Sequence, residues 1–191
     1  MTRVVGLVLA AGSGSRMGRP KAEVTLEGVR LLDRAVAVLS AAGCADIVAV
    51  VRRDTSVGGA RAVVNDDPDR GMRSSLALGI DAASEPAPDA VAVILVDTPG
   101  ITADAVRAVL AAWRPGRIAV ATYDRRRGHP TVMAPDLWRR ALALAGPDEG
   151  ARALLRVEAD AVDEIAVDGD PTDLDTPDEL ATWVVGHDKP R

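Results

Sequence analysis

A glycine-rich stretch near the start of the chain carries residue types that bind phosphate. Gly12 and Gly14 come first, and two basic residues, Arg16 and Lys21, follow closely. Glycine lets backbone N–H groups approach an anion, while a guanidinium fork and an ammonium group neutralise phosphate oxygens. Two cations on one loop predict a binding site for a triphosphate. The alternative is a surface turn whose charges are merely solvated.

Two common phosphate-binding loops do not fit this stretch. A P-loop requires Gly-Lys followed by Ser or Thr, whereas here Gly18 is followed by Arg19-Pro20-Lys21. The dinucleotide-binding fingerprint would place its third glycine at the position of Met17. The remaining interpretation is a phosphate-binding loop of another kind.

Apolar runs rich in Val, Ile and Leu alternate with segments of helical spacing. The runs predict strands over residues 4–10, 47–51, 60–65, 90–96 and 118–122, and the spacing predicts helices over 29–42, 74–83 and 102–113. Strands that are apolar on both faces and alternate with helices indicate a mostly parallel sheet covered on each side. We expect a single three-layer α/β/α domain over residues 1–191 with a Rossmann-like sheet.

The polar segments of such a fold are informative when they follow a strand, because ligands of open sheets bind beyond the carboxyl ends of the strands. Residues 12–21, 65–68 and 97–99 all have this position. It favours binding over the solvated-turn interpretation of the glycine-rich loop.

The composition argues against several classes of partner. A formal charge of −5 and a pI near 5.1 disfavour a broad electrostatic contact with nucleic acid or an anionic membrane. No stretch resembles a signal peptide or is long enough to span a bilayer. The single cysteine, Cys44, precludes an internal disulfide and is expected to be a small buried residue. We expect a cytoplasmic protein that binds neither nucleic acid nor membranes.

Residues 9–21, LAAGSGSRMGRPK, resemble the signature of the MobA-like nucleoside-triphosphate transferases. Further blocks follow in the family's order, at residues 65–79, 96–99, 128–130, 150–152 and 174–180, so that the pattern covers nearly the whole chain. The last three blocks resemble the molybdenum-cofactor cytidylyltransferases, and Thr98 stands where methionine is frequent. The resemblance implies a fold of the nucleotide-diphospho-sugar transferase type. Residues 1–100 would form its NTP-binding half and residues 101–191 its acceptor-binding half.

The reaction implied by this resemblance joins a nucleotide to a phosphorylated acceptor. A phosphate oxygen of the acceptor attacks the α-phosphorus of the nucleotide, and pyrophosphate leaves. A phosphate monoester, with its second pKa at about 6, is largely ionised at neutral pH and needs no general base. A chain with two histidines agrees with this. Positioning and charge neutralisation would supply most of the rate.

The resemblance implies three catalytic residues, Arg16, Lys21 and Asp97. It also implies that Asp97 and Asp175 hold Mg²⁺, an ion that prefers one or two carboxylates and completes its shell with water and phosphate. Each acid has an alternative role, since Asp97 could cap the next helix and Asp175 could organise a turn. Asp173 is the substitute for Asp175.

Ten residues would contact the nucleotide: Leu9, Ala10, Ala11, Gly12, Gly14, Arg16, Lys21, Asn65, Ser75 and Gly79. Four would contact the acceptor: Gly128, His129, Pro130 and Arg152. Ser74 and Ser75 have an alternative role in capping a helix, and Asn65 one in forming a turn. Residues 128–130 are expected to form a loop, with His129 as an acceptor contact and not as an acid-base catalyst.

By the same resemblance, the nucleotide is CTP and the acceptor is molybdopterin, and the product passes to a molybdenum hydroxylase of the xanthine dehydrogenase type. Guanylyl transfer to the same pterin and nucleotidyl transfer to another phosphorylated acceptor remain open. An oxidoreductase of the nicotine-blue type is a third alternative, which the missing third glycine disfavours. A non-catalytic cofactor carrier is a fourth alternative. The joint presence of four residues disfavours it: Arg16, Lys21, Asp97 and Asp175.

Overall fold

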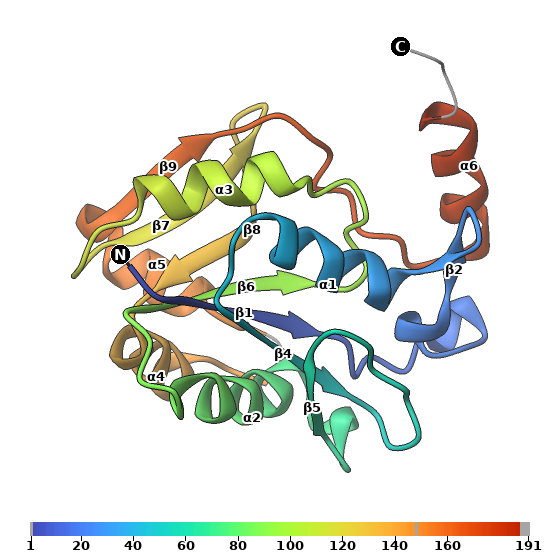
Figure 1. Cartoon of the computed structure of the whole chain (residues 1–191), viewed down its shortest axis with the longest axis horizontal. Coiled ribbons are helices and arrows are strands. Elements are labelled where there is room, and N and C mark those ends of the chain that lie inside the picture. Colours follow the sequence, from blue (N-terminus) through green and yellow to red (C-terminus); the bar gives the residue numbers. More distant parts are fainter. Residues whose placement is uncertain (1, 148, 188–191) are drawn as a thin grey trace.

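The architecture is a large sheet with helices on both faces (Figure 1). The computed structural model describes residues 2–147 and 149–187. The strands are β1 (Val4–Leu9), β2 (Thr25–Leu26), β3 (Val29–Arg30), β4 (Asp46–Val51), β5 (Arg61–Val64), β6 (Ala90–Leu95), β7 (Ile118–Tyr123), β8 (Arg126–Met133) and β9 (Val162–Ala166). The α-helices are α1 (Leu31–Ala41), α2 (Met72–Ser84), α3 (Ala103–Ala112), α4 (Pro135–Leu144), α5 (Arg152–Val157) and α6 (Pro177–His187).

The main sheet has seven strands in the order β5-β4-β1-β6-β8-β7-β9. β1 pairs in parallel with β4 and β6, β4 with β5, and β7 with β9, while β8 is antiparallel to both β6 and β7. The predicted mostly parallel sheet and three-layer arrangement are therefore confirmed. In Figure 1, α1 and α3 lie on one side of the sheet and α2 and α4 on the other.

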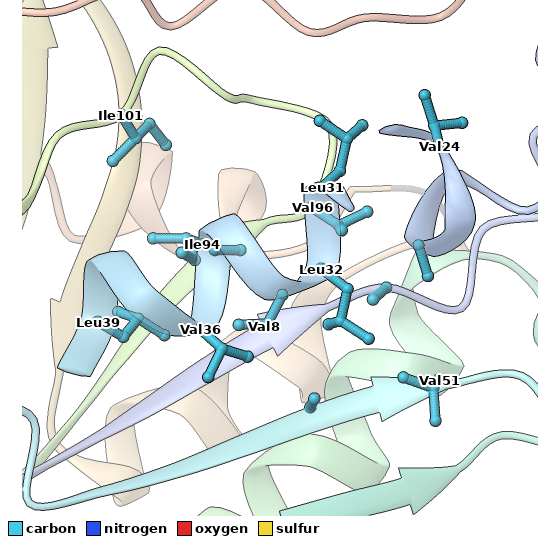
Figure 2. Packing of buried hydrophobic residues seen from close by; sticks show 14 of the residues in the cluster. Val8, Val24, Leu31, Leu32, Val36, Leu39, Val51, Ile94, Val96 and Ile101 are labelled. Atoms are coloured by element: carbon cyan, nitrogen blue, oxygen red, sulfur yellow. The ribbon is translucent and has the colours of Figure 1, made fainter. Parts of the chain in front are cut away.

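Side chains of β1 pack alternately into the two helical layers, because successive residues of a strand point to opposite faces. Val8 belongs to a buried cluster with Leu32 and Leu39 of α1, whereas Leu7 belongs to one with Leu76 and Ile80 of α2. Figure 2 shows the first of these clusters, with the apolar side of α1 against β1 and β4. Burial on both faces explains why β1 is apolar throughout.

The predicted helix over residues 29–42 begins later than expected. Val29 and Arg30 form β3, which pairs with β2 across a tight turn, and α1 starts at Leu31. The turn residues Glu27 and Gly28 both have positive φ, at 51° and 79°, as a two-residue hairpin of this kind requires.

The expected loop at residues 128–130 is wrong, because these residues belong to β8. The register of β8 against β7 is irregular here. Val120 pairs with Thr131 and Thr122 with Arg127, so that three residues of β8 lie opposite one of β7. Pro130 lies in this irregular stretch, where a residue without an N–H group interrupts no regular hydrogen-bond ladder.

In the part of the chain that the structure describes, no helix combines the length and the apolarity needed to cross a bilayer.

Candidate functional site

The glycine-rich loop follows the carboxyl end of β1, and its tight turn depends on Gly14. This residue has φ 59° and ψ 37°, and a Cβ atom there would lie 2.0 Å from the carbonyl oxygen of Arg19. Only glycine satisfies both conditions. Gly12 is different, since its Cβ would meet only the Cδ atom of Lys21, at 4.0 Å. The missing side chain of Gly12 therefore keeps the surface beside Lys21 open.

Lys21 is the centre of a charged cluster that joins three distant parts of the chain. Its Nζ donates to Oδ2 of Asp97 at 2.5 Å and also to Oδ1 of Asp175. Nη1 of Arg16 donates to Oδ2 of Asp175 at 3.0 Å. The side chains of Lys21 and Asp97 are 16% and 15% exposed, while that of Arg16 is 73% exposed. The structure thus brings together all four residues of the expected catalytic and metal-binding sets.

Asp175 reaches this cluster because the connection from β9 to α6 packs across the end of β6. In Figure 1 this connection runs past the ends toward which the β1 and β6 arrows point. The backbone N–H of Leu174 donates to the carbonyl of Asp97 at 2.8 Å, and that of Asp170 to Gly100 at 3.1 Å. A Cβ on Gly100 would lie 2.5 Å from the carbonyl oxygen of Asp170, so the close packing depends on glycine.

A capping box then fixes the start of α6 beside Asp175. Glu179 accepts hydrogen bonds from the backbone N–H groups of Asp175 and Thr176, at 2.7 and 2.9 Å, and Thr176 accepts one from the N–H of Glu179. These bonds hold the pKa of Glu179 below its ordinary value, the bond from Asp175 contributing most. Asp175 therefore directly precedes a capped helix start, and its side chain contacts Lys21 and Arg16.

The alternative role of Asp97 as a helix cap is wrong, because Thr102 caps α3 through its bond from the N–H of Ala105. Asp97 instead points one carboxylate oxygen at Lys21, while its buried Oδ1 has no hydrogen-bond partner among the described residues. An unpaired buried carboxylate oxygen is costly unless a cation or donor arrives.

The charged groups of the cluster change the pKa values of Lys21 and Asp175. Burial lowers the pKa of Lys21, but the charge of Asp97 and the hydrogen bonds to Asp175 and Asp97 outweigh it, so the pKa of this ammonium group lies above its ordinary value. The hydrogen bond from Lys21 holds the pKa of Asp175 below its usual range. Lys21 and Asp175 are consequently both charged at neutral pH.

The carboxylates of this cluster suit a divalent cation that brings further ligands with it. Among residues 2–147 and 149–187, no group of three or more His, Cys, Asp or Glu is close enough to hold a metal ion alone. Two carboxylates, one with an unpaired buried oxygen, match the incomplete protein shell that Mg²⁺ accepts when phosphates and water supply the rest.

Asn65, Ser74 and Ser75 form a hydrogen-bonded group at the start of α2. Nδ2 of Asn65 donates to both serine hydroxyls, at 3.0 and 2.9 Å, and its Oδ1 accepts from the N–H of Asp67. The N-cap of α2 is Gly71, so the alternative role of Ser74 and Ser75 as helix caps is wrong. The amide of Asn65 is thus used to join the turn after β5 to α2.

Gly79 has a clear packing role in α2. A Cβ at this position would lie 2.7 Å from Leu7 and 2.8 Å from Val50, on the two strands beneath the helix. The glycine therefore faces the sheet and allows close contact between α2 and the sheet.

A cavity of about 280 Å³ lies between the ends of β6 and β8 and the start of α5. Gly128, His129 and Arg152 line it, as does Asp173, and so does Thr98, the residue after Asp97 of the charged cluster. Its lining also includes apolar side chains that sequence reasoning did not single out: Leu76, Val93, Val120, Trp138 and Leu155. Their strand or helix spacing marks them only as core residues, so no signal in the sequence reveals the cavity.

His129 is held in one orientation at this cavity. Its Nδ1 lies 3.1 Å from the carbonyl oxygen of Val93 and can only donate to it, while the Tyr123 hydroxyl donates to the His129 carbonyl at 2.6 Å. Burial lowers the pKa of His129 and outweighs the opposing effects of the Val93 carbonyl and Asp97. The ring is therefore neutral at neutral pH.

Nucleotidyltransferases are the class of protein that this fold and these charges match. The chain belongs to the MobA-like NTP transferase family, whose model matches residues 6–164. Two curated relatives are similar over most of their length. The nicotine blue oxidoreductase of Paenarthrobacter nicotinovorans is 36% identical over 93% of this chain and 94% of that protein. The molybdenum cofactor guanylyltransferase of Rhodobacter capsulatus is 34% identical over 94% of both chains.

Solved structures agree with this family. The Rv0371c homologue from Mycobacterium sp. strain JC1 is 30% identical, with a TM-score of 0.84 over 96% of both chains. A complex of Rv0371c from Mycobacterium tuberculosis with manganese is 25% identical, with a TM-score of 0.77 over 97% of this chain and 100% of that one. A divalent metal thus accompanies this fold in a related protein.

Proposed function

We propose that this protein transfers the nucleoside monophosphate of an NTP, with CTP as the first candidate, to the phosphate of molybdopterin. The observation that carries the proposal is the convergence of Arg16, Lys21, Asp97 and Asp175 beside a cavity large enough for a small acceptor. Family membership supports the reaction class. The R. capsulatus relative, named as a molybdenum cofactor guanylyltransferase, supports nucleotidyl transfer and a molybdopterin-type acceptor.

In this reaction, an ionised phosphate oxygen of the acceptor forms a bond to the α-phosphorus, and the bond from that phosphorus to the bridging oxygen of pyrophosphate breaks. Lys21 and Arg16 would neutralise charge on the triphosphate and on the departing pyrophosphate. Backbone N–H groups of the loop, beside the open surface at Gly12, would bind phosphate oxygens. No residue has to remove a proton from the nucleophile.

Asp97 and Asp175 would hold Mg²⁺, with the unpaired Oδ1 of Asp97 as one ligand. The ion would offset negative charge on the phosphates during transfer. The structure of the manganese complex of Rv0371c supports a divalent metal, and magnesium is our specific choice.

The acceptor would occupy the cavity beside this cluster. Gly128, His129 and Arg152, which line the cavity, and the adjoining Pro130 are its proposed contacts. The Arg152 guanidinium would lie near the acceptor phosphate, and the neutral imidazole beside the ring system. The nucleoside would contact the loop residues Leu9, Ala10 and Ala11, and Ser75 beside Asn65. A molybdenum hydroxylase in the cytoplasm would receive the product.

Two relatives name rival activities. The R. capsulatus guanylyltransferase favours GTP as the nucleotide, which would change the product and leave the mechanism intact. The P. nicotinovorans relative is named as an oxidoreductase of nicotine blue, which favours a redox reaction as the rival activity.

The test is pyrophosphate release by the purified protein with Mg²⁺ and molybdopterin, with and without molybdenum, in separate reactions with CTP, GTP, ATP and UTP. We expect release with CTP and its loss in an Asp97→Ala variant. Release with GTP alone would replace cytidylyl by guanylyl transfer. Oxidation of NAD(P)H in the presence of nicotine blue, with no pyrophosphate release from any nucleotide, would refute the proposal.

A further inference from the structure

Lys21 lies between the two carboxylates that the proposed metal would share. Its ammonium group contacts Oδ2 of Asp97 at 2.5 Å and also Oδ1 of Asp175, so that it bridges the two carboxylates. Magnesium binds carboxylate oxygens at about 2.0–2.1 Å. An ion that bridged the same oxygens would overlap with the Lys21 nitrogen. An ion that used Oδ1 of Asp97 and also contacted Asp175 would still lie close to the ammonium group, and the two cations would repel each other.

The charges of the cluster explain why a lone metal ion would gain little by displacing Lys21. Arg16 and Lys21 together carry two positive charges, and Asp97 and Asp175 carry two negative charges. The cluster is therefore neutral as it stands. A divalent ion added alone would leave an excess of positive charge, whereas a metal–triphosphate complex would bring its own negative charge.

Both cations of the cluster are able to turn toward a triphosphate. Arg16 is 73% exposed and makes a single contact with Asp175, and Lys21 has a flexible four-carbon stem beside the open surface at Gly12. Phosphate oxygens would replace the carboxylates as partners of both side chains. The carboxylates would then be available to the metal.

We infer that Lys21 blocks the metal position in the free protein and vacates it only when a triphosphate binds. The inference rests on the proposed function for the identity of the metal site. It makes Lys21 a positioning residue as well as a phosphate ligand, because it couples metal binding to nucleotide binding. The free protein should then bind a divalent ion weakly, and the nucleotide and the metal should enter together.

The experiment measures Mn²⁺ binding by the electron paramagnetic resonance signal of the free ion, with no nucleotide present. Lys21→Met and Lys21→Gln remove the blocking charge, and Arg19→Met removes a neighbouring charge that has no ion pair among the described residues. We expect both Lys21 variants to bind Mn²⁺ at least about tenfold more tightly than the wild type, equivalent to about 1.4 kcal/mol. Arg19→Met should resemble the wild type.

A second arm locates the ion and tests the coupling. The double variant Lys21→Met/Asp97→Asn should lose the gain in Mn²⁺ affinity. Addition of a non-reacting α,β-methylene analogue of CTP should tighten Mn²⁺ binding to the wild type more than to Lys21→Met. Circular dichroism would show that each variant is folded.

Equal Mn²⁺ affinities of the wild type and both Lys21 variants would overturn the inference, as would an equal gain in Arg19→Met. Failure of the proposed function is distinguishable from these outcomes. It would appear as an absence of pyrophosphate release in the separate assay, whereas the comparison of Mn²⁺ affinities uses neither nucleotide nor acceptor.

Discussion

Two carboxylates share the ammonium group of Lys21, and each has a specific expected effect on the reaction. Asp97→Asn and Asp175→Asn keep the size of the side chains but remove the charge that would hold the metal. We expect each to lower the rate of pyrophosphate release on the order of 100-fold or more, the scale of losing one strong electrostatic contact in an active site. The rate at saturating nucleotide and Mg²⁺ measures this.

Asp178→Asn is the matched control, because Asp178 is an exposed carboxylate three residues beyond Asp175, in the first turn of α6. Its rate should remain that of the wild type. An Asp97→Asn protein with an unchanged rate would remove Asp97 from the reaction.

At the scale of residues, sequence reasoning predicted the charged cluster better than the apolar contacts. Arg16, Lys21 and Asp97 follow the carboxyl ends of strands, where ligands of open sheets bind. They meet in one cluster, in which Asp175 joins Arg16 to Lys21. Asn65 and Gly79 also fall in family-like blocks, yet one bonds within the protein and the other packs against strands. The residue that a side chain contacts across the fold cannot be predicted from its own segment. The hydrogen bonds of Asn65 and the packing of Gly79 are therefore seen only in the structure.

The packing of α2 on the sheet makes Gly79 sensitive to substitution. Gly79→Ala would bring a methyl group within 2.7–2.8 Å of Leu7 and Val50 and should lower the free energy of unfolding by about 1–3 kcal/mol. Urea denaturation measures the change. Gly186→Ala makes the same substitution in α6 at a position where no heavy atom of the described residues outside the helix's own backbone lies within 4 Å, and it should be neutral or slightly stabilising. A neutral Gly79→Ala would contradict the packing role.

The edge strand β9 is joined to β7 by a two-point ion pair that should make stability depend on pH. Arg117 donates to both carboxylate oxygens of Asp163, from Nε at 3.0 Å and Nη2 at 2.5 Å, and this lowers the pKa of Asp163. A lowered pKa stabilises the fold above the unfolded value of about 3.9, and the effect disappears as pH falls through the folded value.

Asp163→Asn should therefore be less stable than the wild type at pH 7, and the difference should shrink below about pH 4. Urea denaturation at both pH values measures this. Asp81→Asn, which changes an exposed carboxylate of α2 without an ion pair among the described residues, should show a smaller difference at pH 7. A difference in the free energy of unfolding between the wild type and Asp163→Asn that grows in acid would contradict the prediction.

At the scale of elements, β1, β4, β5, β6 and β7 could be predicted because each is a dense apolar run. β8 could not, since it begins with Arg126 and Arg127 and contains Pro130, and a proline usually argues against a strand. Its place in the sheet depends on Thr131, Val132 and Met133, which pair with β6. The register shift that accommodates the proline is a property of two strands together.

For the molecule as a whole, binding of the substrates should stabilise the fold, because the proposed site joins β1, β6 and the connection to α6. Mg²⁺ with CTP at about 100 times the dissociation constant should add about 2.7 kcal/mol, or raise the midpoint of thermal unfolding by about 5–10 °C. Differential scanning fluorimetry measures the shift. EDTA should abolish most of it, and an equal shift with CTP and EDTA would exclude a metal requirement.

Lys21 and Asp175 are 154 positions apart, and their contact has a consequence for protein synthesis. A ribosome completes the glycine-rich loop and all seven strands of the main sheet, the last of which ends at Ala166, before it adds Asp175. A partly made chain therefore has an ammonium group with at most one carboxylate beside it. The cluster forms only after Asp175 has been translated, so products truncated before this residue lack part of the proposed catalytic site.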